Sequence, residues 1–371
     1  MILINASNLH HGGGVQAATS IILEILCEKG FNLPLTFWVS TEIDRNLRSA
    51  GVSSDIFKNY FVVDSYGLKF VYSDLSRKLS GFDVVLTIFG PLYTFENRFV
   101  NITGFAQAWI AYPCNEVYQS LSLFDRVKAK LKFAIQKWFF LSSDVLIVEL
   151  EHVKSALYLN VCGPDKDIVV INNSISQVFK DKSLWEPVSL PPCTGKIRFG
   201  FLGKGYKHKN LSIFPEIARI LKQTYKIEVQ FVVTFDESEW LGSDSEFRNV
   251  CDNVGALTNV QCPSFYESVD AVIFPSLLEC FSVTPLEAMA MRKPLFVSDR
   301  PFNRDICKEY GFYFDPLDPK SAAQVIADTL GRPIIDSEFL DAAERHALSF
   351  PGPKDRALAY LRCIADAYTK L

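Results

Sequence analysis

The sequence predicts an α/β protein built from two doubly wound, Rossmann-like parallel sheets, and three observations lead to that class. Short runs of β-branched and aromatic residues alternate with longer helical patterns along the whole chain. This alternation stops once, at a proline-rich segment over residues 181–195, and then resumes. The length of 371 residues suits two domains of about 150 residues each. Strands and helices that alternate at this spacing form parallel sheets with helices on both faces.

In the first half of the chain, the expected strands are short and strongly apolar. They cover residues 1–5, 35–39, 61–64, 83–89, 99–106, 144–148 and 168–172. After the first strand, apolar pairs recur every four residues from Ala17 to Leu26 and predict a helix with one buried face. These elements predict an N-terminal domain over residues 1–180.

The linker, residues 181–195, contains Pro187, Pro191 and Pro192, which neither a helix nor a central strand tolerates. Beyond it we expect a second domain over residues 196–350. Its expected strands are 197–202, 227–234, 270–274 and 294–298, and its expected helices are 210–223 and 284–291. A last helix over 353–369, within residues 351–371, is predicted to pack back on the N-terminal domain.

Composition narrows the classes of function. Lys and Arg together number 38 against 42 Asp and Glu, a net charge of −4, which lacks the basic excess of a nucleic-acid-binding protein. The nine cysteines form no pair at zinc-ligand spacing and suggest no disulfide framework. No run of 18 apolar residues predicts a transmembrane helix, and the first residues lack the basic start of a signal peptide. We therefore expect a cytoplasmic protein in a reducing compartment.

A strand–loop–helix segment in the second half combines several binding signals. A strand ends at Phe274, a loop carries Glu279, and a helix begins near Thr284. With Thr284 at the N-cap, Pro285 at N1 and Glu287 at N3, the spacing predicts a capping box, a purely structural role for Glu287. The free N–H groups at such a helix start also favour an anionic ligand. Because the loop follows the carboxyl end of a parallel strand, a phosphate site is expected there.

The earlier segment FLGKGYKHKN, residues 201–210, is also a strand end followed by a glycine-containing loop with three lysines. Loop lysines often only face solvent, and that interpretation stays open. In the same domain as the loop of Glu279, however, Lys204 and Lys209 can converge on one diphosphate. A cation 4 Å from a phosphate gains about 4 kcal/mol of Coulomb attraction at an effective dielectric constant of 20.

Together these segments resemble the retaining glycosyltransferases of family 4, also called glycosyl transferases group 1, and the resemblance runs across nearly the whole chain. Glu279 and Glu287 match the family's E-x7-E pair within PSLLECFSVTPLEAMAMRKPLFVSD, and Lys204 and Lys209 match its G-[RK]-x4-K-N element. The resemblance implies the GT-B fold, with residues 1–180 on the acceptor side. Residues 196–350 would then bind a nucleotide-sugar donor in a cleft between the domains.

The resemblance also implies roles for single residues. Lys204 and Lys209 would bind the donor diphosphate. Glu279, the catalytic candidate, would contact hydroxyls of the donor sugar near the anomeric carbon, and Glu287 would hold the nucleotide ribose. Because the family is metal-independent, no metal and no cofactor other than the donor substrate is expected.

Backbone groups complete the expected donor site. The N–H groups of Ser282, Val283 and Thr284 would cap the distal phosphate. Gly13 and Gly14 would approach the donor from the other domain, since glycine allows backbone to come close to a ligand.

The chain departs from the family pattern at three places. Cys280 and Ser282 stand where the family often has glycines. Many members carry a histidine after a strand of the first domain, and the matching stretch NITGFAQAWIAYP has none; Gln107 or Trp109 stands near that place. An Asp165-Lys166-Asp167 triplet matches a metal pattern of another transferase fold, but it is better interpreted as a polar turn.

The function expected from these observations is retaining transfer of a sugar from a nucleoside diphosphate sugar to a glycan or lipid-linked glycan acceptor. Surface polysaccharide synthesis (O-antigen, lipopolysaccharide or capsule) is the expected setting. One alternative is a sugar-nucleotide epimerase of the same fold, which needs a histidine near the sugar, and we expect no histidine in the core motifs. The other is a non-catalytic sugar-nucleotide-binding partner of a transferase.

A helical stretch over residues 124–139 bears on location. One arc of about 100° at helical spacing contains the apolar residues Phe124, Val127, Leu131, Ala134, Ile135 and Trp138. Basic residues flank that arc on both sides, with Arg126, Lys130 and Lys137 on one side and Lys128 and Lys132 on the other. Such a helix fits peripheral contact with a membrane, here the inner face of the plasma membrane. The favoured interpretation is a helix whose apolar arc packs on the first sheet, with a solvated basic rim.

Overall fold

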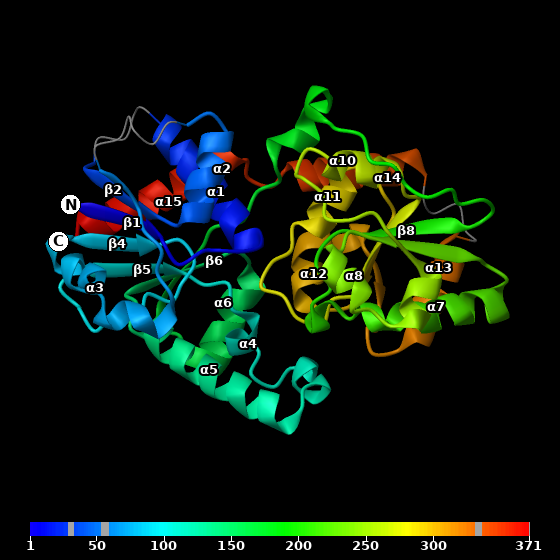
Figure 1. The fold of residues 1–371 in the computed structure, drawn as a ribbon, viewed down its shortest axis with the longest axis horizontal. Helices are drawn as coiled ribbons and strands as arrows, with labels where there is room; N and C mark the ends of the chain where they lie inside the picture. Colours follow the sequence, from blue (N-terminus) through cyan, green and yellow to red (C-terminus); the bar gives the residue numbers. More distant parts are fainter. Residues whose placement is uncertain (29–32, 53–58, 331–335, 371) are drawn as a thin grey trace. The chain divides into compact units, whose positions relative to one another are not determined.

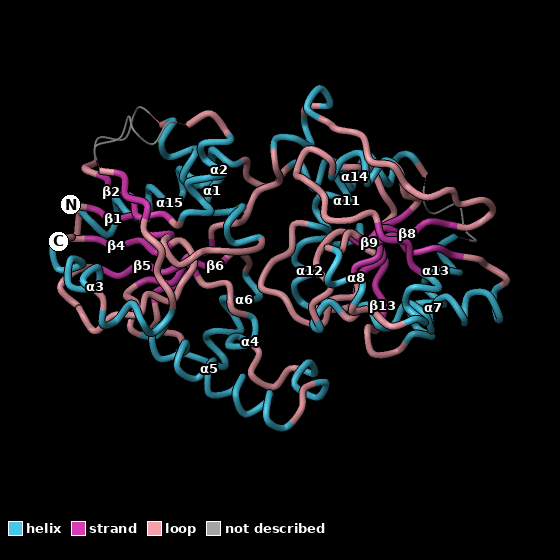
Figure 2. Tube along the Cα trace, viewed as in Figure 1, coloured by secondary structure: helices cyan, strands magenta, loops and turns pink. Residues whose placement is uncertain are grey.

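The computed structural model describes residues 1–28, 33–52, 59–330 and 336–370 and divides into two compact units (Figure 1). The N-terminal unit comprises Met1–Cys114, Ser122–Ser174 and Pro351–Leu371. The C-terminal unit comprises Asn115–Leu121 and Ile175–Phe350, so it takes in a short segment of the first half of the chain. In each unit the strands lie at the centre and helices lie outside them (Figure 2).

The N-terminal unit contains a parallel sheet of seven strands in the order β3-β2-β1-β4-β5-β6-β7. Its strands are β1 (Ile2–Ala6), β2 (Leu35–Val39), β3 (Tyr60–Val62), β4 (Val84–Thr87), β5 (Val100–Gly104), β6 (Val145–Val148) and β7 (Asp167–Val170). Every strand expected in the first half is present, so the doubly wound class is confirmed for this unit. The runs over 83–89 and 99–106 extend past β4 and β5, because Ile88, Phe89 and Phe105 in the loops that follow are also buried.

Two helices from opposite ends of the chain cover one face of this sheet. These are α1 (Gly13–Cys27) and α15 (Pro353–Tyr368), which pack against each other and against β1 and β4. The side chains of Ile22 and Ile364 are fully buried in this layer. The other helices of the unit are α2 (Thr41–Ser49), α3 (Asp74–Lys78), α4 (Ala108–Ala111), α5 (Leu123–Leu141) and α6 (Glu151–Leu157).

A buried polar cluster fixes α15 to the unit. The guanidinium of Arg356 is buried and donates a hydrogen bond to the side-chain oxygen of Asn173. Burial raises the pKa of the neighbouring Glu149 to about 7, while the charge of Arg356 opposes that rise.

The helix expected over 124–139 is present as α5, but the expectation that its apolar arc packs on the sheet is wrong. Phe124, Val127, Leu131 and Trp138 are all exposed. The helix is instead held to the unit through a different side, where Phe139 and Phe140 are buried. No helix among the described residues is long and apolar enough to cross a membrane.

The C-terminal unit contains a parallel sheet of six strands in the order β10-β9-β8-β11-β12-β13. Its strands are β8 (Ile197–Phe201), β9 (Val229–Val233), β10 (Cys251–Asn253), β11 (Ala271–Phe274), β12 (Leu295–Ser298) and β13 (Phe312–Phe314). Its helices are α7 (Phe214–Ile220), α8 (Glu237–Leu241), α9 (Ser245–Val250), α10 (Cys262–Glu267), α11 (Thr284–Ala290), α12 (Pro301–Cys307), α13 (Pro319–Leu330) and α14 (Ser337–Leu348). The two candidate loops follow β8 and β11, which are neighbours at the centre of this sheet.

The expected helix over 210–223 is wrong at its start. Asn210 adopts a left-handed backbone conformation, with φ 59°, so α7 begins only at Phe214. The structure also contains β10 and β13, which the sequence pattern did not predict. Each has three residues, too few to display the alternation by which a strand is recognised.

Candidate active site

Two loops meet at the carboxyl end of the second sheet. One leaves β8 and runs from Leu202 to Asn210, and the other leaves β11 and carries Glu279. The loops are joined through one carbonyl, that of His208, which accepts hydrogen bonds from the backbone N–H of Leu277 at 2.7 Å and from the hydroxyl of Ser276 at 3.1 Å. Because β8 and β11 are adjacent, the sheet positions both loops at the same place.

Glu279 lies at the junction of these loops in a buried ion pair. Its Oε1 atom lies 2.6 Å from the Nζ of Lys209 and accepts a hydrogen bond from the Ser276 hydroxyl at 2.7 Å. The two charged side chains are only 11% and 14% exposed. The Nζ of Lys209 also lies 4.9 Å from the ring centre of Phe274, the last residue of β11. The structure therefore brings Lys209 and Glu279, predicted from separate motifs, into one contact.

His208 is a site residue that sequence reasoning missed. Its Nε2 lies 3.8 Å from the Oε1 of Glu279. Burial lowers the pKa of the His208 imidazole, against the raising effect of the Glu279 charge, so the ring is neutral near pH 7. The expectation that no histidine lies in the core motifs is wrong. The signal was present in the sequence, because His208 stands directly before Lys209 in KHKN.

Lys204 has a different environment from Lys209. Its Nζ lies 3.6 Å from Asp236, the N-cap residue of α8, and its side chain is 52% exposed. The next residue, Gly205, donates its N–H to Glu239 of the same helix. Lys204 and Lys209 are thus held by different carboxylates in this structure.

The start of α11 corrects the predicted capping box. The helix begins at Thr284 itself, and its N-cap is Val283, which makes no side-chain capping bond. Thr284 instead donates its hydroxyl to the carbonyl of Leu202 at 3.3 Å, which ties α11 to the loop after β8. Thr284 is therefore at N1 and Glu287 at N4, so the two cannot form a capping box, which joins the N-cap and N3 residues.

Glu287 is buried in the interior of the unit. Its Oε2 accepts a hydrogen bond from the hydroxyl of Tyr266 at 2.9 Å. Burial raises the pKa of this carboxyl to about 7, and the Tyr266 hydrogen bond only partly offsets that rise. The cost of burying the ionised form is therefore large at neutral pH. A buried carboxylate with a neutral partner is poised to accept hydrogen bonds from hydroxyls of a ligand.

The remaining predicted backbone donors lie in both units. Ser282 and Thr284 are buried beside the start of α11. Gly13 and Gly14 belong to the N-terminal unit, where they form the first turn of α1. Space for a Cβ exists at Gly13, and the conformation that requires glycine is instead at Gly12, with φ 75°.

The place of the family histidine is occupied by residues that pack on α5. Gln107 donates a side-chain hydrogen bond to Gln136 at 3.4 Å. The ring of Trp109 stacks on Phe133 with centroids 5.4 Å apart. Both side chains thus have packing partners on α5.

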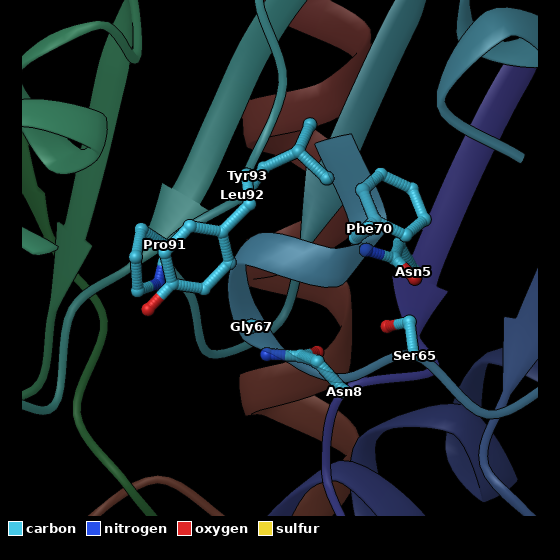
Figure 3. Close-up of a pocket in the computed structure, with 8 residues that line it drawn as sticks. All are labelled: Asn5, Asn8, Ser65, Gly67, Phe70, Pro91, Leu92 and Tyr93. Atoms are coloured by element: carbon cyan, nitrogen blue, oxygen red, sulfur yellow. The ribbon is translucent and has the colours of Figure 1, made fainter. Parts of the chain in front are cut away.

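A small pocket also lies near the carboxyl ends of β1 and β4 in the N-terminal unit (Figure 3). Asn8 and Ser65 present polar groups to it, and Tyr93 contributes its ring. Its lining comprises Asn5, Asn8, Ser65, Gly67, Phe70, Pro91, Leu92 and Tyr93. Within the described ranges, no group of three or more His, Cys, Asp or Glu side chains is arranged to hold a metal ion.

Comparison with known proteins agrees with this arrangement. Residues 187–346 match the family model of glycosyl transferases group 1, and this range contains Lys204, Lys209, Glu279 and Glu287. A curated relative is the O-antigen chain mannosyltransferase RfbU of Salmonella typhimurium, which is 23% identical over 151 residues. That match covers 39% of this chain and 42% of the length of RfbU.

Solved structures resemble the chain over its whole length. The sucrose-phosphate synthase of Thermosynechococcus elongatus has a TM-score of 0.70 at 13% identity, with 100% of this chain and 99% of that chain covered. Anabaena HepE, solved in complex with UDP and glucose, has a TM-score of 0.66 at 14% identity, with 100% and 99% covered. The fold is thus the GT-B fold. Within the C-terminal unit, residues 187–346 thus match the glycosyl transferases group 1 family.

Proposed function

We propose that the chain is a retaining glycosyltransferase that moves a sugar from a nucleoside diphosphate sugar to a glycan or lipid-linked glycan. The observation that carries this proposal is the Lys209–Glu279 pair, which puts a cation and a carboxylate side by side at the ends of two central strands. The match of residues 187–346 to the family model and the similarity to RfbU, an O-antigen chain mannosyltransferase, support a role in surface polysaccharide synthesis.

In this proposal Lys209 stabilises the diphosphate as it leaves the sugar. A preorganised cation in a site that excludes water stabilises developing charge without reorganising at the moment of reaction. Glu279 already fixes the position of this cation, at 2.6 Å, and its Oε2 remains to accept a hydroxyl of the donor sugar. By analogy with the family, the leaving phosphate accepts the proton of the acceptor hydroxyl, so retention needs no protein nucleophile.

The other assignments stay proposals that rest on the family pattern. Glu287 holds the ribose through its carboxylate, and Lys204 adds a second, more exposed cation to the diphosphate. The N–H groups of Ser282, Val283 and Thr284 bind the distal phosphate. Contact of Gly13 and Gly14 with the donor stays a prediction as well.

The contact between His208 and Glu279 favours one competing function. A sugar-nucleotide epimerase needs carboxylates and a histidine near the sugar, and the neutral His208 imidazole lies 3.8 Å from Glu279. A neutral imidazole can act as a proton acceptor. The transferase proposal is preferred because Lys209, rather than His208, makes the short contact to Glu279.

The experiment that tests the proposal is incubation with a panel of labelled UDP-, GDP- and ADP-sugars. Slow release of the free sugar, and its transfer when an extract of lipid-linked glycans is added, is the expected result. Interconversion of two sugar nucleotides without an acceptor would identify an epimerase. Binding without any turnover would identify a non-catalytic partner of another transferase.

We propose a cytoplasmic location, where nucleotide sugars are available. None of the described cysteines forms a disulfide bond in the structure, which fits a reducing compartment. Labelling with a thiol reagent in intact cells and in lysed cells tests this location. Cys27 and Cys114 are exposed, so they should react only after lysis.

A further inference from the structure

α5 exposes a continuous row of large apolar side chains. Each is more than half exposed, and the ring of Phe95 extends the row by contacting Trp138 edge-on with centroids 5.7 Å apart. We call this surface the α5 strip. It comprises Phe95, Leu123, Phe124, Val127, Leu131 and Trp138.

The α5 strip is not the side through which the helix is held to its unit. That side carries Phe139 and Phe140, which are buried, and Phe133, whose ring stacks on Trp109 of α4. In Figure 1, α5 lies at the periphery of the N-terminal unit. Exposed apolar side chains are common singly, but five along one helix, extended by Phe95, indicate a binding surface.

Basic residues border the α5 strip on both sides. At 100° per residue, Arg126, Lys130 and Lys137 fall on one side of it, and Lys128 and Lys132 fall on the other. The helix has five basic residues and one acidic residue, a net charge of +4, whereas the whole chain has a net charge of −4. The positive charge is thus concentrated around the apolar surface.

We propose that the α5 strip binds the surface of a membrane that contains anionic lipids, with α5 lying in the plane of the interface. A membrane surface matches this arrangement of apolar and basic residues. Its acyl chains can take up the apolar row, and the phosphates of its headgroups can bind the basic residues on either side. Lysine and arginine side chains are long enough to reach those phosphates while the apolar row enters the acyl region. Trp138, an aromatic residue with a polar N–H, suits the boundary between the layers.

This proposal goes beyond the transfer reaction and uses none of the donor-site residues. It brings the chain to the surface on which a lipid-linked acceptor is displayed. It also gives a role to the apolar face of α5, which is exposed in the structure. Vesicle binding requires neither nucleotide nor turnover, so its failure can be distinguished from failure of the proposed transferase activity.

The test is co-sedimentation of the full chain with vesicles of phosphatidylcholine alone and with vesicles that contain 30% phosphatidylglycerol. Binding to the anionic vesicles is expected, with a strong decrease in 0.5 M NaCl. Leu131→Asp should lower the partition coefficient by about tenfold or more, because it removes one apolar side chain and adds a negative charge. Lys128→Gln with Lys132→Gln should lower it about 25-fold, or about fivefold for each cation near the surface.

The matched control is Leu241→Asp. Leu241 ends α8 and is 65% exposed, against 63% for Leu131, so the same substitution is made at equal exposure on the other unit. Equal binding of the two Asp variants would overturn the proposal, as would absence of wild-type binding. A wild-type dimer in size-exclusion chromatography that Leu131→Asp converts to a monomer, without vesicle binding, would show that a second copy covers the α5 strip instead.

Discussion

Glu279 and Glu287 stand eight residues apart in one motif, but the first is paired with a cation and the second with a neutral hydroxyl. Glu279 is held by the ammonium group of Lys209 at 2.6 Å and by the hydroxyl of Ser276. Glu287 is buried against the neutral hydroxyl of Tyr266, and its pKa is raised to about 7. One carboxylate is compensated before any ligand binds, and the other is not.

The difference follows from where each residue stands. Glu279 lies in a loop that meets a second, lysine-bearing loop from the adjacent strand β8. Glu287 lies on α11, a helix that is buried along its whole length. A loop side chain can pair with a charged side chain from the loop of the adjacent strand. A side chain on a buried helix has only the mostly neutral groups of the core as partners. The motif therefore combines a carboxylate paired with a cation and a carboxylate whose partner is the neutral hydroxyl of Tyr266.

Removal of the cation from the compensated pair should have the largest effect. Lys209→Ala leaves Glu279 mostly buried without its counter-charge, which should lower the free energy of unfolding by about 3 kcal/mol. It should also weaken binding of the nucleoside diphosphate about ten- to a hundredfold, but of the matching nucleoside much less. Calorimetric titration and urea unfolding measure both effects. Lys207→Ala is the control on the same loop, and equal behaviour of the two variants would refute the diphosphate assignment.

Neutralising the compensated carboxylate should separate binding from chemistry. Glu279→Gln keeps the shape of the side chain and leaves Lys209 free to bind phosphate, so nucleotide affinity should stay nearly unchanged. Transfer should fall at least a hundredfold, because the amide cannot replace the carboxylate at the sugar. Single-turnover assays with the donor found by the panel measure this loss. Transfer at the wild-type rate would exclude Glu279 from the site.

Neutralising the uncompensated carboxylate should change how stability depends on pH. The folded state of Glu287 holds its proton up to about pH 7, whereas the ordinary value for the unfolded chain is 4.5. The folded protein therefore binds more protons between these values, and the free energy of unfolding falls as pH rises. Between pH 5 and pH 8, the titration of Glu287 should lower the free energy of unfolding by about 2–3 kcal/mol.

Glu287→Gln removes that contribution, so its stability relative to wild type should increase with pH over this range. Urea unfolding of both proteins at pH 5, 6, 7 and 8 without nucleotide measures the difference. Glu149, whose pKa is also raised to about 7, titrates equally in both proteins and cancels in the comparison. Parallel curves would show that Glu287 is ionised at the ordinary pH.

The exposed lysine of the same motif should matter less than the buried one. Lys204 is 52% exposed and its partner Asp236 is on the surface, so water screens the contact. Lys204→Ala should weaken nucleoside diphosphate binding by less than about fivefold. Titration beside Lys209→Ala checks this ranking, and a larger loss for Lys204→Ala would reverse it.

Removal of divalent metal ions should have the smallest effect on the transfer rate. If Lys209 and Lys204 supply the positive charge at the diphosphate, dialysis against EDTA should leave the transfer rate unchanged. Loss of activity that Mg²⁺ or Mn²⁺ restores would mean that a cation, rather than these lysines, carries the charge.

The fold was predictable to a large extent because its strands are buried on both faces. Strands such as β4 and β11 are then continuous apolar runs bounded by polar loops, which sequence alone reveals. Helix boundaries that depend on the backbone conformation of a single residue could not be predicted from the sequence. Nothing in the helical pattern after β8 indicates that Asn210 turns left-handed and delays α7 to Phe214.

The site was predictable as a set of residues but not as a set of contacts. Lys209 and Glu279 lie 70 positions apart, and their ion pair depends on the adjacency of β8 and β11, which no local pattern specifies. The capping box predicted for Thr284 and Glu287 failed because α11 starts one residue earlier than the spacing suggested, with Val283 at the N-cap. The exposure of α5 depends on which of its sides meets the unit, and an amphipathic pattern fixes only the existence of an apolar side.

During synthesis on a ribosome, β1 to β7 emerge about 200 residues before α15, which completes the layer over their sheet. At 5–20 residues per second, that delay lasts about 10–40 s. Throughout this interval the apolar layer around Ile22 lacks its second helix, while the C-terminal unit is synthesised in full. The unit that begins first is therefore finished last. Until α15 is synthesised, this sheet face is available for binding by nascent-chain chaperones.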